Sequence, residues 1–284
     1  MPGPRTRSFL PLGDTSPLGG AAPGATVPEG DTVYRAAKNL DAVLRGQTLT
    51  KSDFRVPAFA TVDLTGRAVD EVLSVGKHLL HRIGDVTLHT HLKMEGSWHV
   101  YRHGTTWKRP AYQARVVLET ADWVAVGFDL GIVELVPRDD EESAVGYLGP
   151  DLLGPGWDSE VAVANLVRDP DREIGLALLD QRNLAGIGNV YRNELCFLRG
   201  VLPTRPVREV ENVPKMVDLA YRLLQANKDR VDRTTTGQLR GQTDWVYGRA
   251  GRPCRRCGTK IRRGTLGESE LELRDTYWCP RCQT

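Results

Sequence analysis

Four of the five cysteines form two closely spaced pairs near the end of the chain. The pairs are Cys254-x-x-Cys257 and Cys279-x-x-Cys282. In a cytosolic protein such pairs indicate a metal site before a disulfide, and four thiolates are the usual ligands of a structural Zn²⁺. We predict one zinc ion that supplies shape and no chemistry, because four protein ligands leave no open position. The fifth cysteine, Cys196, lies in an apolar helical pattern and is predicted to be a core residue.

Basic residues gather around the first cysteine pair. Residues 249–263 hold seven Lys or Arg and no Asp or Glu, and residues 228–284 hold 13 Lys or Arg against 7 Asp or Glu. A zinc module with this charge is typical of nucleic-acid-binding proteins. Between the pairs, polar and apolar residues alternate over 268–273 and 275–278, which predicts a β-hairpin.

The stretch Pro28-Glu29-Gly30 stands where the composition changes. Residues 1–27 are rich in Pro and Gly without apolar periodicity, whereas residues 31–44 have the spacing of an amphipathic helix that ends at Gly46. Taken alone, Pro and Glu at a helix start are a structural device, since Pro fits the first turn and Glu complements the helix dipole. A reactive role for Pro28 depends on the other motifs.

A glycine-containing turn, Ala185-Gly-Ile-Gly-Asn-Val190, precedes a second predicted helix. Glycines at alternate positions let the N–H groups of a helix start approach an anion, and phosphate is the usual anion. Asn189 adds a donor at the mouth of this turn. We therefore predict a helix–turn–helix that grips a DNA backbone.

Histidine and lysine side chains in the strand-rich part are further candidates. His89 and His91 share one face of a predicted strand, which would suit a metal pair. No third ligand is near them in sequence, so packed or hydrogen-bonded histidines are favoured. Lys77 lies between Gly76 and an apolar run, and its side chain points either to solvent or into a cleft.

These residues need a scaffold of two kinds. Short β-branched and aromatic segments predict an antiparallel sandwich or barrel with strands at 69–75, 76–83, 86–92, 97–101, 114–118 and 123–126. An acidic, Gly- and Pro-rich connector (137–158) precedes helices predicted at 160–167, 172–181, 190–197 and 214–227. The predicted organisation is a disordered extension or mis-assigned start at 1–27, a β-domain at 28–150, a helical DNA-binding domain at 151–250 and a zinc finger at 251–284.

Length and composition exclude several classes of protein. A chain of 284 residues with 40% hydrophobic and 26% charged residues is globular, and no apolar run approaches the roughly 18 residues of a membrane helix. Residues 1–27 lack the continuous apolar core of a secretory signal. We expect a cytoplasmic monomer without a membrane partner.

Taken together, the Pro-Glu-Gly helix start, the Gly-Lys of a strand, the Ala-Gly-Ile-Gly-Asn turn and the four-Cys finger resemble the formamidopyrimidine-DNA glycosylase / endonuclease VIII family. The resemblance covers nearly everything from Pro28 to Gln283. It implies an α+β fold with an N-terminal β-sandwich and flanking helix, a helix–two-turn–helix domain and a C-terminal zinc finger. It also implies base-excision repair, in which a damaged base is flipped out of duplex DNA.

The resemblance assigns catalytic roles. Pro28 would be the nucleophile whose amine attacks the sugar C1′ and forms a Schiff base before β,δ-elimination cuts the strand. Glu29 would be its acid/base partner, and Lys77 the catalytic lysine of the β-domain. A terminal amine with a pKa near 8 and a neighbouring carboxyl group suit this chemistry.

The same resemblance assigns DNA contacts. Gly188 and Asn189 would hold a phosphate at the turn. Met94 would enter the gap left by the flipped base. Arg274 would bind a phosphate near the lesion and assist the second elimination.

One segment departs from part of the family. Residues 127–133 lack the Arg and the Phe placement of the branch that acts on oxidised purines. This departure favours the endonuclease VIII branch and oxidised pyrimidines as substrates.

A chemical condition applies to Pro28. Inside a chain that starts at Met1 its nitrogen is a tertiary amide and forms no Schiff base. We therefore expect translation to start at Val27, with the initiator removed. If the extension is retained, the alternative is a catalytically inactive DNA-binding protein on the same scaffold. A zinc-ribbon RNA- or ribosome-associated factor is a third hypothesis, which explains only the C-terminal part.

Overall fold

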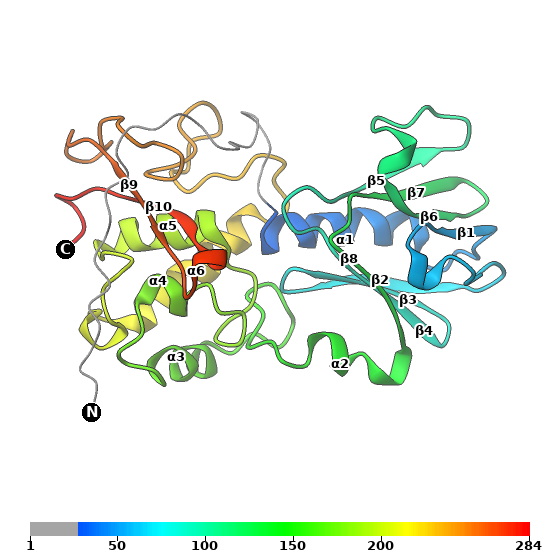
Figure 1. Ribbon diagram of the computed structural model, residues 1–284, viewed down its shortest axis with the longest axis horizontal. Coiled ribbons are helices and arrows are strands. Elements are labelled where there is room, and N and C mark those ends of the chain that lie inside the picture. Colours follow the sequence, from blue (N-terminus) through cyan, green and yellow to red (C-terminus); the bar gives the residue numbers. More distant parts are fainter. Residues whose placement is uncertain (1–27) are drawn as a thin grey trace.

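The computed structural model describes residues 28–284 and shows a strand-rich region beside a helical one (Figure 1). The strands are β1 (Lys51–Phe54), β2 (Val69–Val75), β3 (His78–Ile83), β4 (Val86–His91), β5 (Ser97–Arg102), β6 (Ala114–Glu119), β7 (Trp123–Phe128), β8 (Ile132–Pro137), β9 (Arg262–Leu266) and β10 (Arg274–Trp278). The α-helices are α1 (Gly30–Leu44), α2 (Glu142–Val145), α3 (Ser159–Val167), α4 (Ile174–Ala177), α5 (Asn189–Arg199) and α6 (Val213–Asn227).

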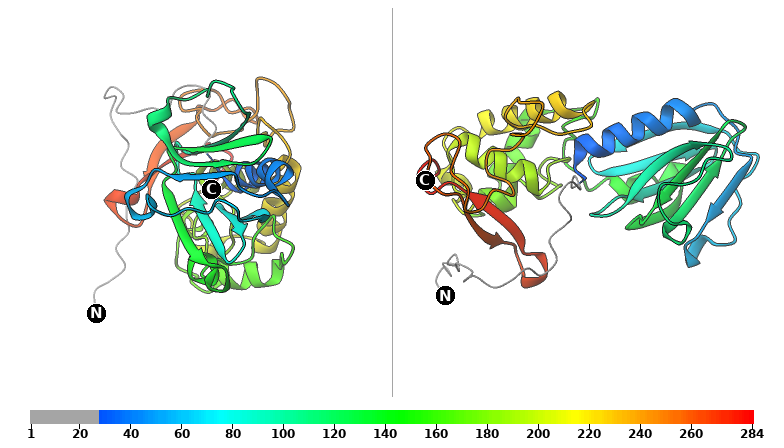
Figure 2. Two further views of the ribbon diagram at one scale, coloured as in Figure 1. Left: turned by 90° about the vertical axis from the view of Figure 1, so that its right-hand side faces the viewer. Right: turned by 90° about the horizontal axis from the view of Figure 1, so that it is seen from above.

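The strand-rich region is an antiparallel β-sandwich, as predicted. One sheet has the order β1-β6-β7-β5 and the other β2-β3-β4-β8, and every pairing within them is antiparallel. Alternate apolar residues of both sheets meet the apolar face of α1 in one core, which includes Leu40, Leu79 and Leu118. Helix α1 therefore belongs to the sandwich, while its first residues reach the helical region (Figure 2).

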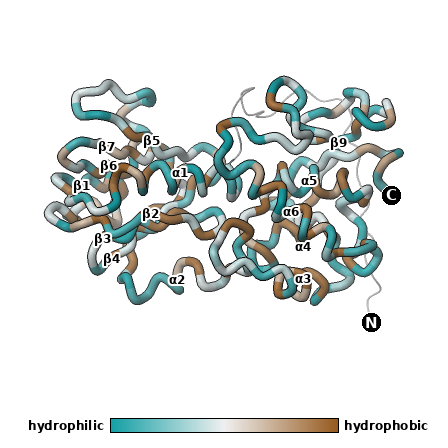
Figure 3. Tube along the Cα trace, turned by 180° about the vertical axis from the view of Figure 1, so that it is seen from behind, coloured by the Kyte–Doolittle hydropathy of each residue, from teal (hydrophilic) through white to brown (hydrophobic). Residues whose placement is uncertain are grey.

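The helical region has its own core around α5 and α6. Leu195 on α5 and Met216 and Leu224 on α6 are fully buried in it. Cys196 is also buried there, as predicted. Along the chain, apolar and polar residues alternate in short blocks in both regions (Figure 3), as expected where amphipathic elements each bury one face. Within residues 28–284 no helix has both the length and the apolar composition to cross a membrane.

The structure corrects two predicted elements. The helix expected at 172–181 is only Ile174–Ala177, because the chain turns away after it and the Gln181 side chain bonds the backbone of residues 179, 186 and 187. The finger hairpin pairs β9 with β10, with Arg274 opposite Leu266. Residues 268–273 form its exposed tip, where the alternation of Glu and Leu reflects no strand (Leu271 is 99% exposed).

Two strands and the helical turns of the acidic run were missed by the sequence patterns. Strands β1 and β8 each complete one edge of a sheet. The acidic run at 139–142, expected in an irregular connector, forms short helical turns, because its Glu141 pairs with Arg82 of the sandwich. The helix end at Gly46 is as predicted: the glycine follows the cap residue Arg45 and has a left-handed φ of 72°.

Candidate active site and metal centre

The carboxylate of Glu29 is buried at the junction of the two regions, against the first turn of α5. It accepts hydrogen bonds from the backbone N–H groups of Gly188 (2.8 Å), Val190 (2.7 Å) and Tyr191 (3.4 Å). The first N–H groups of a helix have no partner within it, and they carry the positive end of its dipole. A side chain from the start of α1 therefore caps a helix of the other region, and its position is fixed by three donors.

The glycines around this contact are required by close approach. A Cβ on Gly188 would lie 2.6 Å from the Glu29 carboxyl carbon, and a Cβ on Gly30 would lie 2.9 Å from the Cα of Gly186. The N–H of Gly30 donates to the Gly186 carbonyl oxygen at 2.9 Å. The two backbones therefore touch where the regions meet, and Pro28, which is partly exposed, lies next to the contact.

The helix-start N–H groups of the glycine turn hold the Glu29 carboxylate, so the anion bound by these donors is a side chain of the chain itself, and the predicted contacts of Gly188 and Asn189 with a DNA phosphate stay predictions. The amide of Asn189 donates to the Asp275 carbonyl oxygen at 2.9 Å, and the buried Arg192 donates to the same oxygen at 2.9 Å. These bonds seat the β9–β10 hairpin on the start of α5. They place Arg274, which is exposed, beside the turn.

A buried ion pair lies behind Glu29. Arg233, from the segment after α6, donates to both oxygens of Asp31 at 2.7 and 2.5 Å. The Tyr191 hydroxyl donates to the same carboxylate at 2.8 Å. Burial raises the pKa of Asp31, but the charge of Arg233 and these hydrogen bonds bring it below its usual value. Asp31 is therefore an anion at neutral pH.

Lys77 lies in the tight turn between β2 and β3, and this turn faces the glycine turn. Gly76 has a left-handed φ of 58°, a Cβ there would lie 2.9 Å from the Cβ of Ala185, and its N–H donates to the partly buried Asp151 carboxylate at 2.9 Å. Burial lowers the pKa of Lys77 to about 8, opposed by the negative charge of Glu29. A lysine with this pKa exchanges protons readily near neutral pH.

The histidines of the sandwich are hydrogen-bonded, as favoured by the sequence. The Nδ1 of His78 lies 2.7 Å from the Nε2 of His89, whose Nδ1 lies 2.9 Å from Glu134. Tyr147 reaches the other nitrogen of His78 at 3.0 Å. Burial lowers the pKa of His78 to about 4, so it is neutral at pH 7.

Met94 lies in the exposed turn between β4 and β5, with 54% of its surface accessible. Arg109 holds this turn by donating to the Glu95 carbonyl oxygen at 3.0 Å and to Asp129 at 2.7 Å. Residues 127–133, where the sequence differs from the purine-acting branch, include Asp129. Arg109 therefore connects this segment to the turn that carries Met94.

The four cysteines predicted as metal ligands lie together beyond α5. Their sulfurs are all within 4.8 Å of one another, with 3.9 Å between Cys254 and Cys282 and 3.5 Å between Cys257 and Cys279. Zn–S bonds of about 2.3 Å in a tetrahedron place sulfurs about 3.8 Å apart. The donor set therefore fits one metal ion. Among residues 28–284, this is also the one group of three or more His, Cys, Asp or Glu side chains close enough to share an ion.

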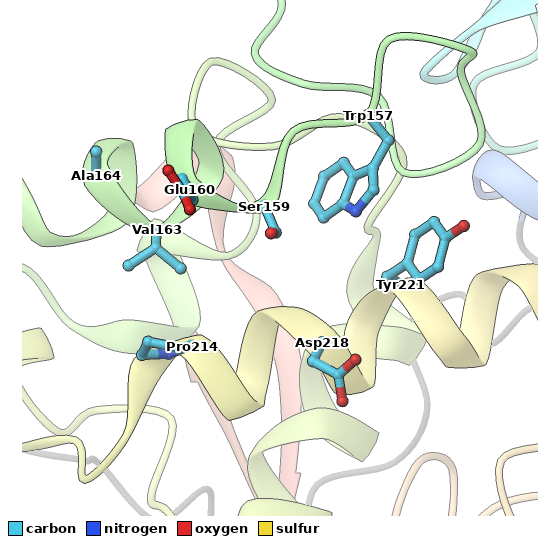
Figure 4. Close-up of a pocket in the computed structure, with 8 residues that line it drawn as sticks. All are labelled: Trp157, Ser159, Glu160, Val163, Ala164, Pro214, Asp218 and Tyr221. Carbon is cyan, nitrogen blue, oxygen red and sulfur yellow. The ribbon is translucent and has the colours of Figure 1, made fainter.

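A cavity of about 560 Å³ lies apart from these residues, between α3 and α6 (Figure 4). Trp157 and Tyr221 stack beside it with ring centroids 5.6 Å apart. None of the predicted site residues lines it.

Comparison with known proteins decides the family. The formamidopyrimidine-DNA glycosylase N-terminal domain matches residues 27–129, and the formamidopyrimidine-DNA glycosylase H2TH domain matches residues 148–228. A relative from Streptomyces coelicolor, named probable endonuclease 8 2, is 56% identical over 261 residues, which are 90% of this chain and 94% of the relative. The chain belongs to the formamidopyrimidine-DNA glycosylase / endonuclease VIII family.

Two further relatives carry names of the endonuclease VIII branch, and a solved structure of the family shows the same fold. The protein named DNA-(apurinic or apyrimidinic site) lyase Nei2, from Mycolicibacterium smegmatis, is 55% identical over 91% of this chain and 99% of its own length. Endonuclease 8 of Escherichia coli is 33% identical over 90% of this chain and all of its own. The Lactococcus lactis Fpg, solved with abasic-site DNA, has the same fold, with a TM-score of 0.75 and 23% identity over 90% and 99% of the two chains.

The structure brings Glu29, Lys77, Gly188 and Asn189 together at one junction, with Pro28 at its edge and Arg274 on the adjoining hairpin. Sequence reasoning missed Asp31, Asp151, Tyr191 and Arg233. Asp31 directly follows Pro-Glu-Gly, which is a usable signal. Arg233 is one of 13 basic residues in its part of the chain, and nothing in its sequence environment distinguishes it.

Proposed function

We propose that the chain is a base-excision-repair DNA glycosylase with AP lyase activity, acting on damaged DNA through the amine of Pro28. The observation that carries this proposal is the fixed carboxylate of Glu29, held by three N–H donors next to Pro28. A nucleophile and its proton-transfer partner must keep a constant relation to the substrate, and a carboxylate with three donors is so constrained.

The steps of the reaction divide among four residues. The free Pro28 amine attacks C1′ of the deoxyribose, the C1′–N bond to the base breaks, and loss of the ring oxygen bond gives the Schiff base. Glu29 moves protons at the sugar, and Lys77, with its pKa near 8, accepts or donates a proton at the opening ring. β-Elimination then cuts the strand, and δ-elimination, assisted by Arg274, releases the sugar fragment.

The first residue of the working enzyme is part of the proposal. Only a chain beginning at Pro28 has the free amine, so we infer initiation at Val27 and removal of the initiator. In support, the N-terminal family domain matches from residue 27, and the Nei2 relative is matched over 99% of its own length by 91% of this chain.

The contacts with DNA and metal complete the proposal. Met94 enters the gap left by the flipped base, Asn189 and Arg274 bind phosphates near the lesion, and Zn²⁺ fills the four-cysteine site. Gly188 contributes by admitting the Glu29 carboxylate. Oxidised pyrimidines are the proposed bases, supported by the endonuclease 8 names of the relatives and by the absence of the purine-branch residues in 127–133.

Borohydride trapping on DNA with one abasic site tests the mechanism. Protein beginning at Pro28 should give a covalent adduct, and protein beginning at Met1, verified by intact mass, should give none. Glu29→Gln, which keeps the shape of the side chain, should slow adduct formation by about 10²–10⁴-fold. DNA binding without an adduct from the Pro28 form would contradict the proposal and favour a non-catalytic DNA-binding protein.

A panel of duplexes tests the substrate. Each carries one oxidised pyrimidine or one oxidised purine, and release of the free base is measured under single-turnover conditions. Faster release of oxidised pyrimidines is expected. Preference for 8-oxoguanine would overturn the assignment of the lesion and leave the Schiff-base chemistry intact.

A further inference from the structure

The guanidinium of Arg233 faces two carboxylates in the first turn of α1. It makes the paired bonds to Asp31, a further bond to the Thr32 hydroxyl at 3.2 Å, and its third nitrogen lies 3.9 Å from the Glu29 carboxylate. The side chains of Arg233 and Asp31 are each 5% exposed, and that of Glu29 is fully buried. A single cation therefore neutralises two anions that flank the turn next to Pro28.

Arg233 is itself held by contacts with two helices. Its guanidinium stands over the Tyr191 ring at 4.9 Å, and Tyr191 belongs to the helix that Glu29 caps. The next residue, Thr234, exchanges two backbone bonds of 2.9 Å with the side chain of Asn227 at the end of α6. The arginine is therefore a rigid link from α5 and α6 to the first turn of α1, and its planar fork defines the orientation of Asp31.

We propose that Arg233 is a positioning residue that holds the Pro28–Glu29 turn in its reactive geometry by binding Asp31 and Thr32. This inference rests on the proposed function. Arg233 touches neither C1′ nor the leaving base. It acts through the backbone of residues 28–32, which the bonds to Asp31 and Thr32 connect to the helical region. Misplacement of a nucleophile by about 1 Å can cost about 100-fold in rate, so a rigid link here matters to the reaction.

The test uses two variants and a control, all beginning at Pro28. Arg233→Lys keeps the charge and loses the fork. Asp31→Asn with Arg233→Met removes the paired charges of Asp31 and Arg233 together, so Asp31 is not left as an uncompensated anion, and Glu29 keeps its three N–H donors. Arg230→Met is the control, because Arg230 lies in the same segment, is exposed, and its guanidinium donates to the Ala226 carbonyl oxygen and not to Asp31 or Glu29.

The rate constant for borohydride trapping at saturating enzyme and the Kd for the same abasic DNA are measured separately. Both Arg233 variants should form the adduct about 100-fold more slowly, with a Kd within threefold of the wild type. Arg230→Met should stay within twofold in rate. Wild-type rates in the Arg233 variants would overturn the proposal. It would also be overturned if the slower rate came with an equally large fold-increase in Kd and a lower urea midpoint, because the variants would then be damaged throughout.

Amide hydrogen exchange of Gly188 and Val190 in DNA-free protein gives a readout independent of catalysis. These amides donate to Glu29, so their exchange should be at least tenfold faster in the double variant and unchanged in Arg230→Met. If the wild type forms no adduct, the proposed function fails, and exchange alone decides the inference. Unchanged exchange in the double variant would then overturn it.

Discussion

Two ion pairs connect helix α1 with the short segment that follows α6, and they differ in burial. Asp31 pairs with Arg233 and Lys38 pairs with Asp229, each with 2.5 Å between the charged atoms. The side chains of the first pair are 5% and 5% exposed, whereas those of the second are 60% and 55% exposed. The same two pieces of chain therefore carry the same interaction in two environments.

The contact distance, which is the same in both pairs, does not show which pair contributes more to stability. Around the buried pair, Tyr191 and Thr32 satisfy further donors and acceptors, and water cannot replace them. Around the exposed pair, water and salt compete with a single bond. Removing one partner of the buried pair strands a charge, and removing one partner of the exposed pair leaves a solvated one.

Arg233→Met alone should have the largest effect, because it leaves Asp31 as a buried uncompensated anion. We expect a loss of about 3–5 kcal/mol in the free energy of unfolding at pH 7, measured by urea denaturation. Arg230→Met should leave the unfolding curve in place. A loss below about 1 kcal/mol would show that the site rearranges or admits water, and would place the pair in the same class as the exposed one.

Removing both charges should have a much smaller effect on stability. Asp31→Asn with Arg233→Met should cost no more than about 1–2 kcal/mol in the same measurement, because a pair replaced by neutral groups of similar volume is often close to neutral. The double variant should therefore have a higher free energy of unfolding than Arg233→Met alone. Equal instability of the single and double variants would mean that packing of the guanidinium dominates, and not its charge.

The pH dependence should distinguish wild type from the double variant. The pKa of Asp31 is lowered in the folded protein from an ordinary value of 3.8, with burial opposing and Arg233 favouring the shift. Its contribution to stability is therefore fully present above pH 3.8 and is lost as the pH falls through the folded value. The stability gap between the two proteins should be constant from pH 7 to 5 and should narrow below pH 3.8. A gap that widens on acidification would contradict this assignment.

The exposed pair should give the smallest effect. Lys38→Ala should shift the urea midpoint at low salt by little more than the scatter between replicate curves, because side-chain entropy and water offset the attraction. At 1 M NaCl even this shift should vanish. A clear, salt-insensitive loss of stability would mean that the Lys38 stem packs on its neighbours, and that the exposed pair does not serve as the solvated reference.

The sequence predicted the fold and most of the site through local patterns. Apolar alternation located most strands of the sandwich, and the cysteine spacing located residues that the structure places within 4.8 Å of one another. The predicted roles of Pro28, Glu29 and Lys77 in the reaction stay predictions. The pattern at 172–181 overextended α4, because apolar spacing alone does not reveal that Gln181 is needed to hold the glycine turn.

The sequence did not reveal which residues far apart in the chain contact each other. The turn Gly186-Ile-Gly188 predicted an anion, but its anion is Glu29, about 160 residues earlier in the chain. Arg233 and Asp31 are 202 residues apart, and neither residue type nor spacing connects them. Such contacts depend on how the two regions dock, which is set by the sum of many weak packing interactions and not by any local motif.

Because Glu29 and Gly188 are in contact, we expect substitutions at these two positions to depend on each other. Any side chain at 188 would occupy the space of the Glu29 carboxylate, so a glycine in one region is maintained by a glutamate in the other. A gene library randomised at both codons and selected for repair should return Gly188 in nearly every clone that encodes Glu29. Clones with alanine at 188 and an unaltered Glu29 at high frequency would show that the two codons vary independently.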